Sequence, residues 1–225
     1  MSSASRRIRV WDLPTRIFHW ALAVLVVFSF TTGKIGGSWM DWHLKSGYAI
    51  LALVLFRLAW GVVGGHTARF ARFVRGPMAF GAHARALVQR RYRAVLGHNP
   101  MGGWMVILML LTLAAQAVSG LFADDEIATQ GPLAVKVSNA LVAKMSSFHY
   151  YNGWALAALV GIHVVAIAAY WFAMRDNLVG PMWSGWRDVE PGTVEPAAGP
   201  AWLAALLLAV AAGAVYWLVA IYPKG

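Results

Sequence analysis

Five long apolar runs occupy most of this chain of 225 residues and restrict what it can fold into. An α-helix needs about 20 mostly apolar residues to cross a bilayer, and each run approaches or reaches that length. Inside lipid the backbone N–H and C=O groups must pair within the segment, so such runs form helices. The predicted spans are residues 17–33, 44–63, 102–122, 151–173 and 202–222. We therefore predict an all-α membrane protein.

The composition agrees with this class and excludes several others. Hydrophobic residues make up 60% of the chain and charged residues 12%, whereas about a quarter of a soluble domain is charged. The absence of cysteine excludes disulfides, cysteine-bound iron–sulfur clusters and covalently attached c-type haem. The net charge of +10 fits cytoplasmic loops and anionic lipid head groups. Membrane lipid is therefore the expected partner of the basic residues, and nucleic acid is not.

Charged residues near the span ends predict the orientation, because basic loops stay in the cytoplasm. Four arginines precede the first span, whereas the other side mixes acidic residues with four lysines. The connection 64–100 holds no acidic residue and is expected to be in part an amphipathic helix on the membrane surface. Its arginines are Arg69, Arg72, Arg75, Arg85, Arg90, Arg91 and Arg93. We predict a multi-pass membrane protein with its N-terminus in the cytoplasm and its C-terminus outside.

The chain is accordingly divided into four parts, with no internal repeat apparent. Residues 1–16 are a cytoplasmic N-terminal segment, 17–175 a core of four spans, 176–200 a linker rich in proline and glycine, and 201–225 an extra C-terminal transmembrane helix. That last span carries small residues four positions apart, a pattern that favours docking on the core or on another subunit. They are Ala205, Ala209 and Gly213. A plain anchoring helix is the alternative.

The seven histidines fall into two groups. His66, His83 and His98 belong to the connection 64–100, where we expect solvated surface residues. The other four lie at the end of a span or inside one, where polar side chains are usually functional. They are His19, His43, His149 and His163.

Helix geometry pairs these four histidines. His149 and His163 are fourteen residues apart on the fourth span, about 21 Å along a helix axis. Fourteen steps of about 100° come to nearly four turns, so both side chains leave the same face. His43 begins the second span on the side of His149, and His19 begins the first span on the side of His163. We predict an outer pair, His43 with His149, and an inner pair, His19 with His163.

Two histidines that face each other across a helical bundle form a bis-imidazole site for haem iron. Zinc usually takes four ligands from His, Cys or carboxylate, and the chain has no Cys and no acidic residue in the interior of a span. We therefore predict that the two histidine pairs bind two b haems within a helical bundle, with an extra fifth helix at the C-terminus. For any one of these histidines alone, the alternative is a hydrogen-bonded packing residue.

Two glycines and one arginine extend this prediction. Both outer histidines occur as His-x-x-x-Gly, in HLKSG and HYYNG, so Gly47 and Gly153 would leave room for a flat porphyrin; the alternative is ordinary helix packing. Arg57 is the one charge well inside a span. It would bind a propionate of the inner haem, or else extend its guanidinium to the cytoplasmic interface.

At these residues the sequence resembles the bacterial cytochrome b561 family, whose relatives include the cytochrome b subunits of nickel–iron hydrogenases. The matching segments cover roughly residues 9–175 and include all four histidines: TRIFHW, WHLKSGYAILALVLFRLAWGVVG, HNPMGGWMVILMLLTLAAQAVSGLF and HYYNGWALAALVGIHV. The resemblance implies a four-helix bundle with two b haems that exchanges electrons with quinone. It also implies the inner membrane of a bacterium, so that the predicted outer side, with the C-terminus, faces the periplasm. It does not extend to the fifth span.

Three functions are compatible with this resemblance. The leading one is transmembrane electron transfer between the quinone pool and a redox partner, expected to be a periplasmic c-type cytochrome. The alternatives are a superoxide:quinone oxidoreductase and a membrane-anchor cytochrome b subunit of a hydrogenase or dehydrogenase complex, so whether the chain is itself an enzyme stays open. Aromatic residues at the outer side would line a quinone pocket or form the interfacial belt common to membrane proteins. They are Trp39, Trp42, Tyr150 and Tyr151.

Overall fold

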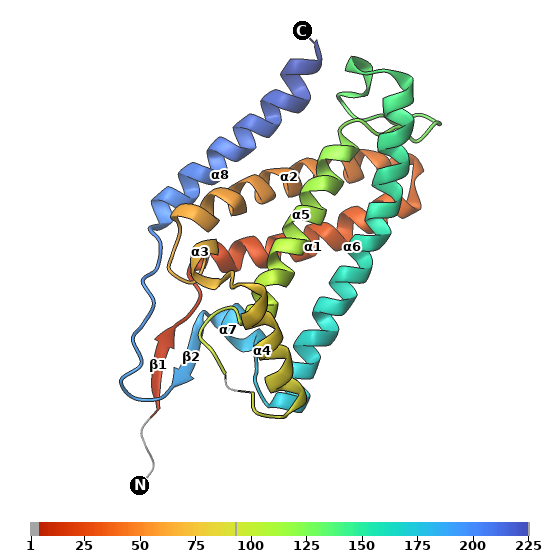
Figure 1. Cartoon of the computed structure of the whole chain (residues 1–225). Helices are drawn as coiled ribbons and strands as arrows, with labels where there is room; N and C mark the ends of the chain where they lie inside the picture. The colour runs from red at the N-terminus through yellow and green to blue at the C-terminus, as the bar shows by residue number, and fades with distance from the viewer. Residues whose placement is uncertain (1–4, 93, 225) are drawn as a thin grey trace. The chain divides into compact units, whose positions relative to one another are not determined.

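A computed structural model of the chain describes residues 5–92 and 94–224, so Arg93 of the basic connection and the ends 1–4 and 225 lie outside the described residues. The helices are α1 (Leu13–Ile35), α2 (Met40–Val63), α3 (Phe70–Phe73), α4 (Pro77–Val88), α5 (Pro100–Gly120), α6 (Asn139–Met174), α7 (Val179–Ser184) and α8 (Ala201–Tyr216) (Figure 1). The strands are β1 (Arg6–Arg9) and β2 (Trp186–Val189). Shorter helical segments are η1 (Gly37–Trp39), η2 (Ala134–Lys136), η3 (Trp217–Ile221) and η4 (Tyr222–Lys224).

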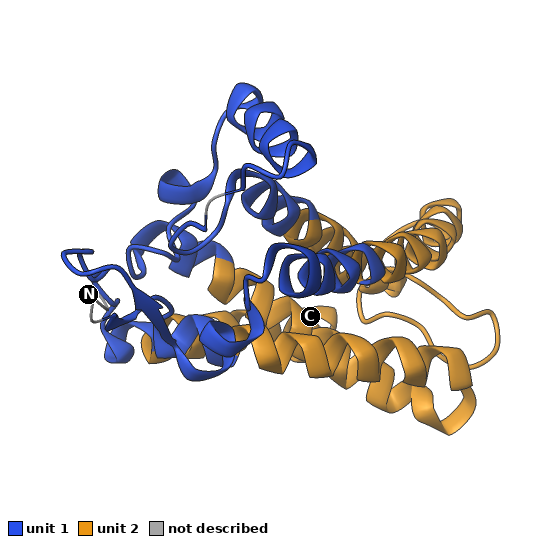
Figure 2. Cartoon of the chain, turned by 90° about the horizontal axis from the view of Figure 1, so that it is seen from below, with its two compact units in different colours: residues 1–17, 58–108, 161–204 blue, residues 18–57, 109–160, 205–225 orange. Residues whose placement is uncertain are grey.

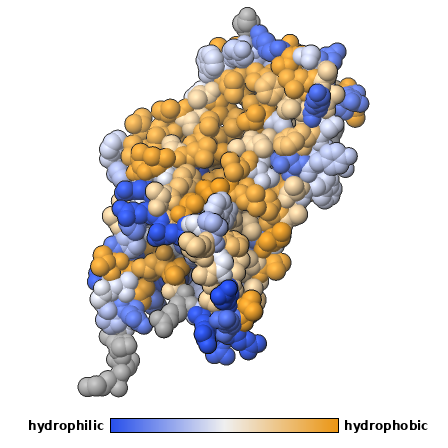
Figure 3. All heavy atoms as spheres, viewed as in Figure 1, coloured by the Kyte–Doolittle hydropathy of each residue, from blue (hydrophilic) through white to orange (hydrophobic). Residues whose placement is uncertain are grey.

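Among the described residues, five helices are long and apolar enough to cross a membrane, which confirms the predicted multi-pass architecture. They are α1, α2, α5, α6 and α8, with η1 preceding α2 and η3 extending α8. Many of their large apolar side chains are exposed, and hydrophobic residues gather on the face shown in Figure 3. Helices that are apolar all round are typical of membrane spans.

All five helices begin earlier than the apolar runs predict, and in two of them a polar side chain caps the first turn. The Oδ1 of Asp12 accepts the N–H of Thr15 at 2.9 Å, so α1 begins at Leu13. The α6 helix begins at Asn139, directly after Ser138, whose hydroxyl oxygen accepts the N–H of Leu141 at 3.4 Å. At about 1.5 Å per residue α6 is roughly 54 Å long, well beyond the length of a single span.

The chain is divided into two compact units whose boundaries fall within the long helices (Figure 2). Unit 1 consists of residues 1–17, 58–108 and 161–204, and unit 2 of residues 18–57, 109–160 and 205–225. In unit 2 one buried cluster consists of Ile50, Val54, Leu113 and Leu156, and a second includes Leu51, Leu121, Leu133 and Val215. Leu22, Leu25 and Val26 of α1 pack against the first cluster, so α1, α2, α5 and α6 all contribute to it.

Unit 1 contains an antiparallel pair of strands that the sequence did not reveal. Arg6 pairs with Val189 and Arg9 with Trp186, and β1 lies beside β2 in Figure 1. Ile8, at 0% exposure, lies in an apolar cluster with Val10 and Trp11, which follow β1, and with Val189 of β2. A four-residue strand with the sequence RRIR lacks the alternation of apolar residues by which strands are recognised, so it was read as part of the N-terminal segment.

The predicted linker 176–200 contains α7 and β2 and is held in place by polar contacts within unit 1. The carboxylate of Asp176, 5% exposed, binds Arg187 at 2.5 Å and accepts a hydrogen bond from the hydroxyl of Tyr92. Further along, the carbonyl of Ala197 accepts the backbone N–H of His66 at 2.8 Å. The buried carboxylate of Asp176 and this backbone bond thus connect the segment 176–200 to the connection 64–100.

The basic connection is partly helical, as predicted, but two of its histidines are not solvated surface residues. His83, on α4, shares a hydrogen bond of 3.0 Å with the hydroxyl of Tyr170, and burial lowers its pKa. The ring of His98 lies 4.3 Å from that of Phe73 and 4.8 Å from that of Trp11. Only the expectation for His66, which is exposed, is confirmed. The partners of His83 and His98 come from distant segments of the chain, so the composition of the connection does not predict them.

The small residues of α8 do not pack on the chain itself. Ala205, Ala209 and Gly213 are exposed, and a Cβ built on Gly213 would meet nothing within 4 Å. The buried residues of α8 instead include Ala211 and Val215. Docking of the small-residue face on the core is therefore wrong, and docking on another subunit stays a prediction.

Removing the carboxylate of Asp176 should destabilise unit 1. Asp176→Ala leaves the guanidinium of Arg187 and the hydroxyl of Tyr92 without their buried acceptor, a loss of about 3 kcal/mol, or about 10 °C in Tm for a chain of this size. Thermal unfolding in detergent measures the fall in Tm, and limited proteolysis should reveal new cleavage within 176–200. Asp188→Ala is the matched control, since Asp188 is an exposed acid on β2, the strand that carries Arg187. Equal Tm values for the two variants would contradict this assignment.

Candidate functional site

His43 on α2 and His149 on α6 face each other within unit 2. Their ring centroids are 6.0 Å apart and their planes are inclined by 87°. A metal ion held about 2 Å from one nitrogen of each ring would place the two centroids about 6 Å apart. The structure therefore brings together the predicted outer pair at a separation that one metal ion between them would require.

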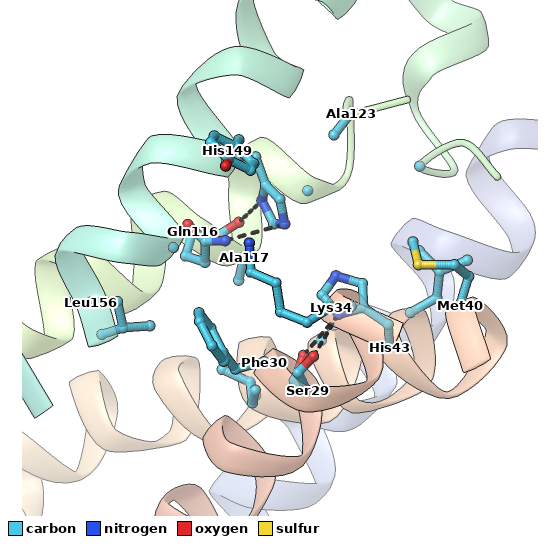
Figure 4. Close-up of a pocket in the computed structure, with 18 of the residues that line it drawn as sticks. Ser29, Phe30, Lys34, Met40, His43, Gln116, Ala117, Ala123, His149 and Leu156 are labelled. Carbon is cyan, nitrogen blue, oxygen red and sulfur yellow. Dashed lines mark hydrogen bonds between the residues drawn. The ribbon is translucent and has the colours of Figure 1, made fainter. Parts of the chain in front are cut away.

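Each of these imidazoles is oriented by a hydrogen bond from Nδ1 to a backbone carbonyl (Figure 4). Nδ1 of His43 donates to the carbonyl of Ser29 at 2.8 Å, and Nδ1 of His149 donates to the carbonyl of Gln116 at 2.9 Å. A carbonyl oxygen only accepts, so the proton lies on Nδ1 and the lone pair on Nε2. This is the tautomer in which imidazole binds a metal through Nε2.

The two carbonyls are presented by the same local device on α1 and α5. In SFTTG the residue three after Ser29 is Thr32, whose hydroxyl donates to the same carbonyl at 3.0 Å. In QAVSG the residue three after Gln116 is Ser119, whose hydroxyl also donates to that carbonyl at 3.0 Å. Glycine follows in both segments. Each carbonyl thus receives an imidazole as well as a hydroxyl from its own helix.

The glycines make room for the imidazoles. A Cβ built on Gly33 would lie 2.7 Å from Nδ1 of His43, and one on Gly120 would lie 2.8 Å from Cε1 of His149. Real Cβ atoms do not approach ring atoms so closely, since overlap of this size forces the side chain away. The ring can reach the carbonyl of residue i only because residue i+4 has no side chain.

A cavity of about 470 Å³ lies beside the two histidines, lined by residues of α1, α2, α5 and α6 and of the loop after α5. This volume is within the range of about 300–1,000 Å³ found for cofactor sites. Its inner end is lined by Ile50, Leu113 and Leu156 of the apolar core. Its loop end carries the charged side chains Lys34 and Asp124. A group with an apolar body and charged substituents fits this gradient.

Gln116 and Asn152 complete the surroundings of His149. Nε2 of Gln116 lies 3.1 Å from Nε2 of His149, and the side-chain oxygen of Gln116 accepts Nδ2 of Asn152 at 2.8 Å. The amide of Gln116 thus donates to the lone pair of the imidazole, which agrees with the tautomer assigned above. A metal on Nε2 would replace this hydrogen bond.

The other predicted site residues are distributed as follows. Gly47 and Gly153 line the cavity; a Cβ on Gly47 would meet nothing within 4 Å, whereas one on Gly153 would lie 3.3 Å from Gln116. His19 belongs to unit 2 and His163 to unit 1, and their pairing stays a prediction. Arg57, on α2, is 2% exposed. Of the four outer aromatic residues, Tyr150 lines the cavity, while Trp39, Trp42 and Tyr151 are exposed outside the described lining.

Sequence reasoning missed the residues that orient the histidines. Ser29, Gly33, Gln116 and Gly120 carry no chemistry that singles them out in an apolar run. The signal was a hydroxyl residue followed by glycine near the end of the first and third spans, TTG and VSG, which by itself is common in membrane helices.

Two opposed imidazoles, each with its proton on Nδ1 and its lone pair on Nε2, lie beside a cofactor-sized cavity among apolar helices. These features characterise a multi-pass membrane protein with a candidate bis-histidine cofactor site. The chain belongs to the prokaryotic cytochrome b561 family, whose model matches residues 10–185. It is therefore a b-type cytochrome of the membrane, and the family implies haem b and electron transfer.

Three relatives are each described as a "Probable Ni/Fe-hydrogenase B-type cytochrome subunit". The protein from Azotobacter chroococcum mcd 1 is 25% identical and that from Azotobacter vinelandii 23%; both alignments cover 80% of this chain and 88% of the relative. The protein from Cupriavidus necator is 22% identical, over 80% of this chain and 87% of its own length. No solved structure matches the chain significantly.

Side chains at Gly33 or Gly120 should disrupt the site. In Gly33→Ala and Gly120→Ala the new methyl group displaces His43 or His149 from its carbonyl, at a cost of about 1–3 kcal/mol. We expect haem content per chain, measured by absorbance, to fall in both variants. Gly213→Ala is the control, because its Cβ has open space. Full haem content and unchanged Tm in both site variants would show that the rings lie elsewhere.

Proposed function

We propose that this protein transfers electrons across the membrane through two bis-histidine b haems, between the quinone pool and a redox partner. The observation that carries the proposal is the opposed pair of imidazoles, His43 and His149, each held by an Nδ1–H···O=C bond. Such ligands leave no open position for substrate at the iron, which is typical of electron carriers. When bound, haem would supply a one-electron redox couple.

The residues of unit 2 fit the outer haem. His43 and His149 would supply the axial ligands, and the carbonyls of Ser29 and Gln116 would keep both Nε2 lone pairs directed at the iron. Gly47 would let the macrocycle approach the backbone, as its open Cβ position supports. Burial among apolar side chains would exclude water and help to set the potential.

The inner haem is the second half of the proposal. His19 and His163 would be its ligands, and Arg57 would bind one of its propionates. Two observations support the latter role: Arg57 lies fourteen residues after His43 on the same helix, and it is 2% exposed. An arginine that extends to the interface would keep its guanidinium in contact with water, so burial favours a partner inside the protein.

The relatives favour a particular kind of partner. Since each is described as a hydrogenase subunit, we propose that this chain also serves as the membrane cytochrome of a larger redox complex that delivers electrons to quinone. The exposed small-residue face of α8 would suit contact with another subunit. A free c-type cytochrome as partner and superoxide as electron donor stay predictions.

The axial ligands can be tested one pair at a time. Purified protein should bind two haems per chain and show a bis-histidine b-type spectrum. His43→Ala or His149→Ala should remove one haem, and His19→Ala or His163→Ala the other, because a single imidazole does not retain a six-coordinate iron. Quinone should oxidise the reduced haems rapidly in stopped-flow mixing. Two haems retained in His149→Ala would refute the pairing, and haems inert to quinone would refute the proposed acceptor.

A glycine variant provides a control that leaves every ligand in place. Gly47→Leu fills space that the protein itself leaves open, so it should exclude the outer haem without lowering the Tm of haem-free protein. Gly213→Leu, on the exposed face of α8, should leave haem content unchanged.

The orientation is a further part of the proposal. The described arginines of the basic connection support a cytoplasmic side for α4, which would place the outer haem near the periplasm. Alkaline phosphatase fused after residue 224 should therefore be active, and the same enzyme inserted after Gln89 inactive. The reverse pattern would invert the assignment.

A further inference from the structure

We propose that Lys34 binds a propionate of the haem between His43 and His149 and thereby raises the midpoint potential of that haem. The inference rests on the proposed function and assigns a role to a residue beyond the axial ligands.

Lys34 is held at the loop end of the cavity by aromatic rings. It lies in the last turn of α1, and its Nζ is 4.4 Å from the ring centroid of Trp154, 4.7 Å from Tyr150 and 5.5 Å from Phe30. The faces of aromatic rings attract an ammonium group and restrict where it can go. Figure 4 shows the side chain of Lys34 extending into the pocket between His43 and His149.

Lys34 is also the one lysine or arginine among the described residues that line this cavity. Two acids, Asp124 and Asp125, line the same end. Asp125 is engaged within its own loop, where its Oδ1 accepts the N–H groups of Ile127, Ala128 and Thr129 at 2.8–3.0 Å. These bonds lower the pKa of Asp125 to about 2, so its carboxylate is negatively charged at neutral pH. Lys34 therefore supplies the positive charge at this end of the cavity.

The polarity of the cavity indicates which end would receive the propionates. Its inner end is apolar, with Leu113 and Leu156 on its wall, and an ionised carboxylate there would be strongly unfavourable. The loop end offers an ammonium group already held in position. A propionate beside Asp124 and Asp125 would meet like charge unless Lys34 lay between, so Lys34 is the group that makes this end acceptable to an anion.

A fixed positive charge near the haem also has a redox consequence. The oxidised iron carries one more positive charge than the reduced iron, so a nearby ammonium group disfavours oxidation and raises the potential. Charge and hydrogen bonding around a haem are among the means by which proteins tune it. Lys34 would thereby counteract the two loop carboxylates, which act in the opposite direction.

Three variants test this role in the intact protein. Lys34→Gln should lower the midpoint potential of one haem in a potentiometric titration followed optically and by EPR. Lys34→Arg, which keeps the positive charge, should have the potential of the wild type. Lys45→Gln is the matched control: Lys45 is exposed, also lies over an aromatic ring, with Nζ 5.0 Å from Trp42, and is not part of the described lining. It should leave both potentials unchanged. Unchanged potentials in Lys34→Gln, or an equal shift in Lys45→Gln, would overturn the inference.

Haem in which both propionates are esterified separates ion pairing from packing. Haem-free wild type and Lys34→Gln are titrated with ordinary haem b and with its dimethyl ester. The variant should bind ordinary haem several-fold more weakly than wild type does, and the ester equally well. A defect of the same size with the ester would mean that Lys34 only supports the fold. This measurement also decides the case in which Lys34→Gln loses the haem during purification.

The outcomes distinguish this inference from the function on which it rests. If the wild type binds no haem that depends on His43 and His149, the proposed function fails. If the wild type does bind a haem that depends on these two histidines, and Lys34→Gln leaves haem affinity and midpoint potential unchanged, only the role of Lys34 fails.

Discussion

The structure of the site depends on one interaction, the hydrogen bond from an imidazole Nδ1 to a backbone carbonyl of the neighbouring helix. A helical carbonyl already accepts the N–H of residue i+4, and its second lone pair is shared here by the hydroxyl at i+3 and the imidazole. In an apolar interior that lone pair is a valuable acceptor, since few other polar groups are near. The imidazole can reach it only where residue i+4 has no Cβ, as at Gly33 and Gly120. The tautomer, the ring orientation and the free Nε2 all follow from that approach.

The two units handle polar groups differently. In unit 2 hydroxyls near the site donate to backbone carbonyls of their own helix, as Thr32 does to Ser29 and Ser119 to Gln116, and the hydroxyl of Ser119 also lies 3.2 Å from Nδ1 of His149. Unit 1 instead contains an ionised network, in which burial and the carboxylate of Asp176 raise the pKa of Tyr92. These hydroxyls add no charge beside the imidazoles, and the charged side chains of this site line the loop end of the cavity. The ionised network suits a region that joins loops and strands outside the spans.

The sequence was sufficient for features that depend on long apolar runs and on residues with unusual chemistry. The five spans and the facing of His43 and His149 could be derived from helix length and period, because both are set by the 1.5 Å rise and 100° turn of the helix. The strand pair of unit 1 could not, since four residues with one apolar side chain carry no periodic signal. The partners of His83 and His98 were also missed, because they come from segments distant in the sequence.

The matching segments SFTTG and QAVSG bear on how the potential of the site would be set. Each presents one carbonyl, one hydroxyl at i+3 and one glycine at i+4 to a histidine, so the two imidazoles are polarised to a similar degree. Ligand basicity would then contribute almost equally from both sides of the iron. What differs between the two sides is the surrounding charge, with Lys34 on α1 and Asp124 and Asp125 after α5. Tuning of such a site would therefore come from the residues at the mouth of the cavity, which can change without disturbing the ligands.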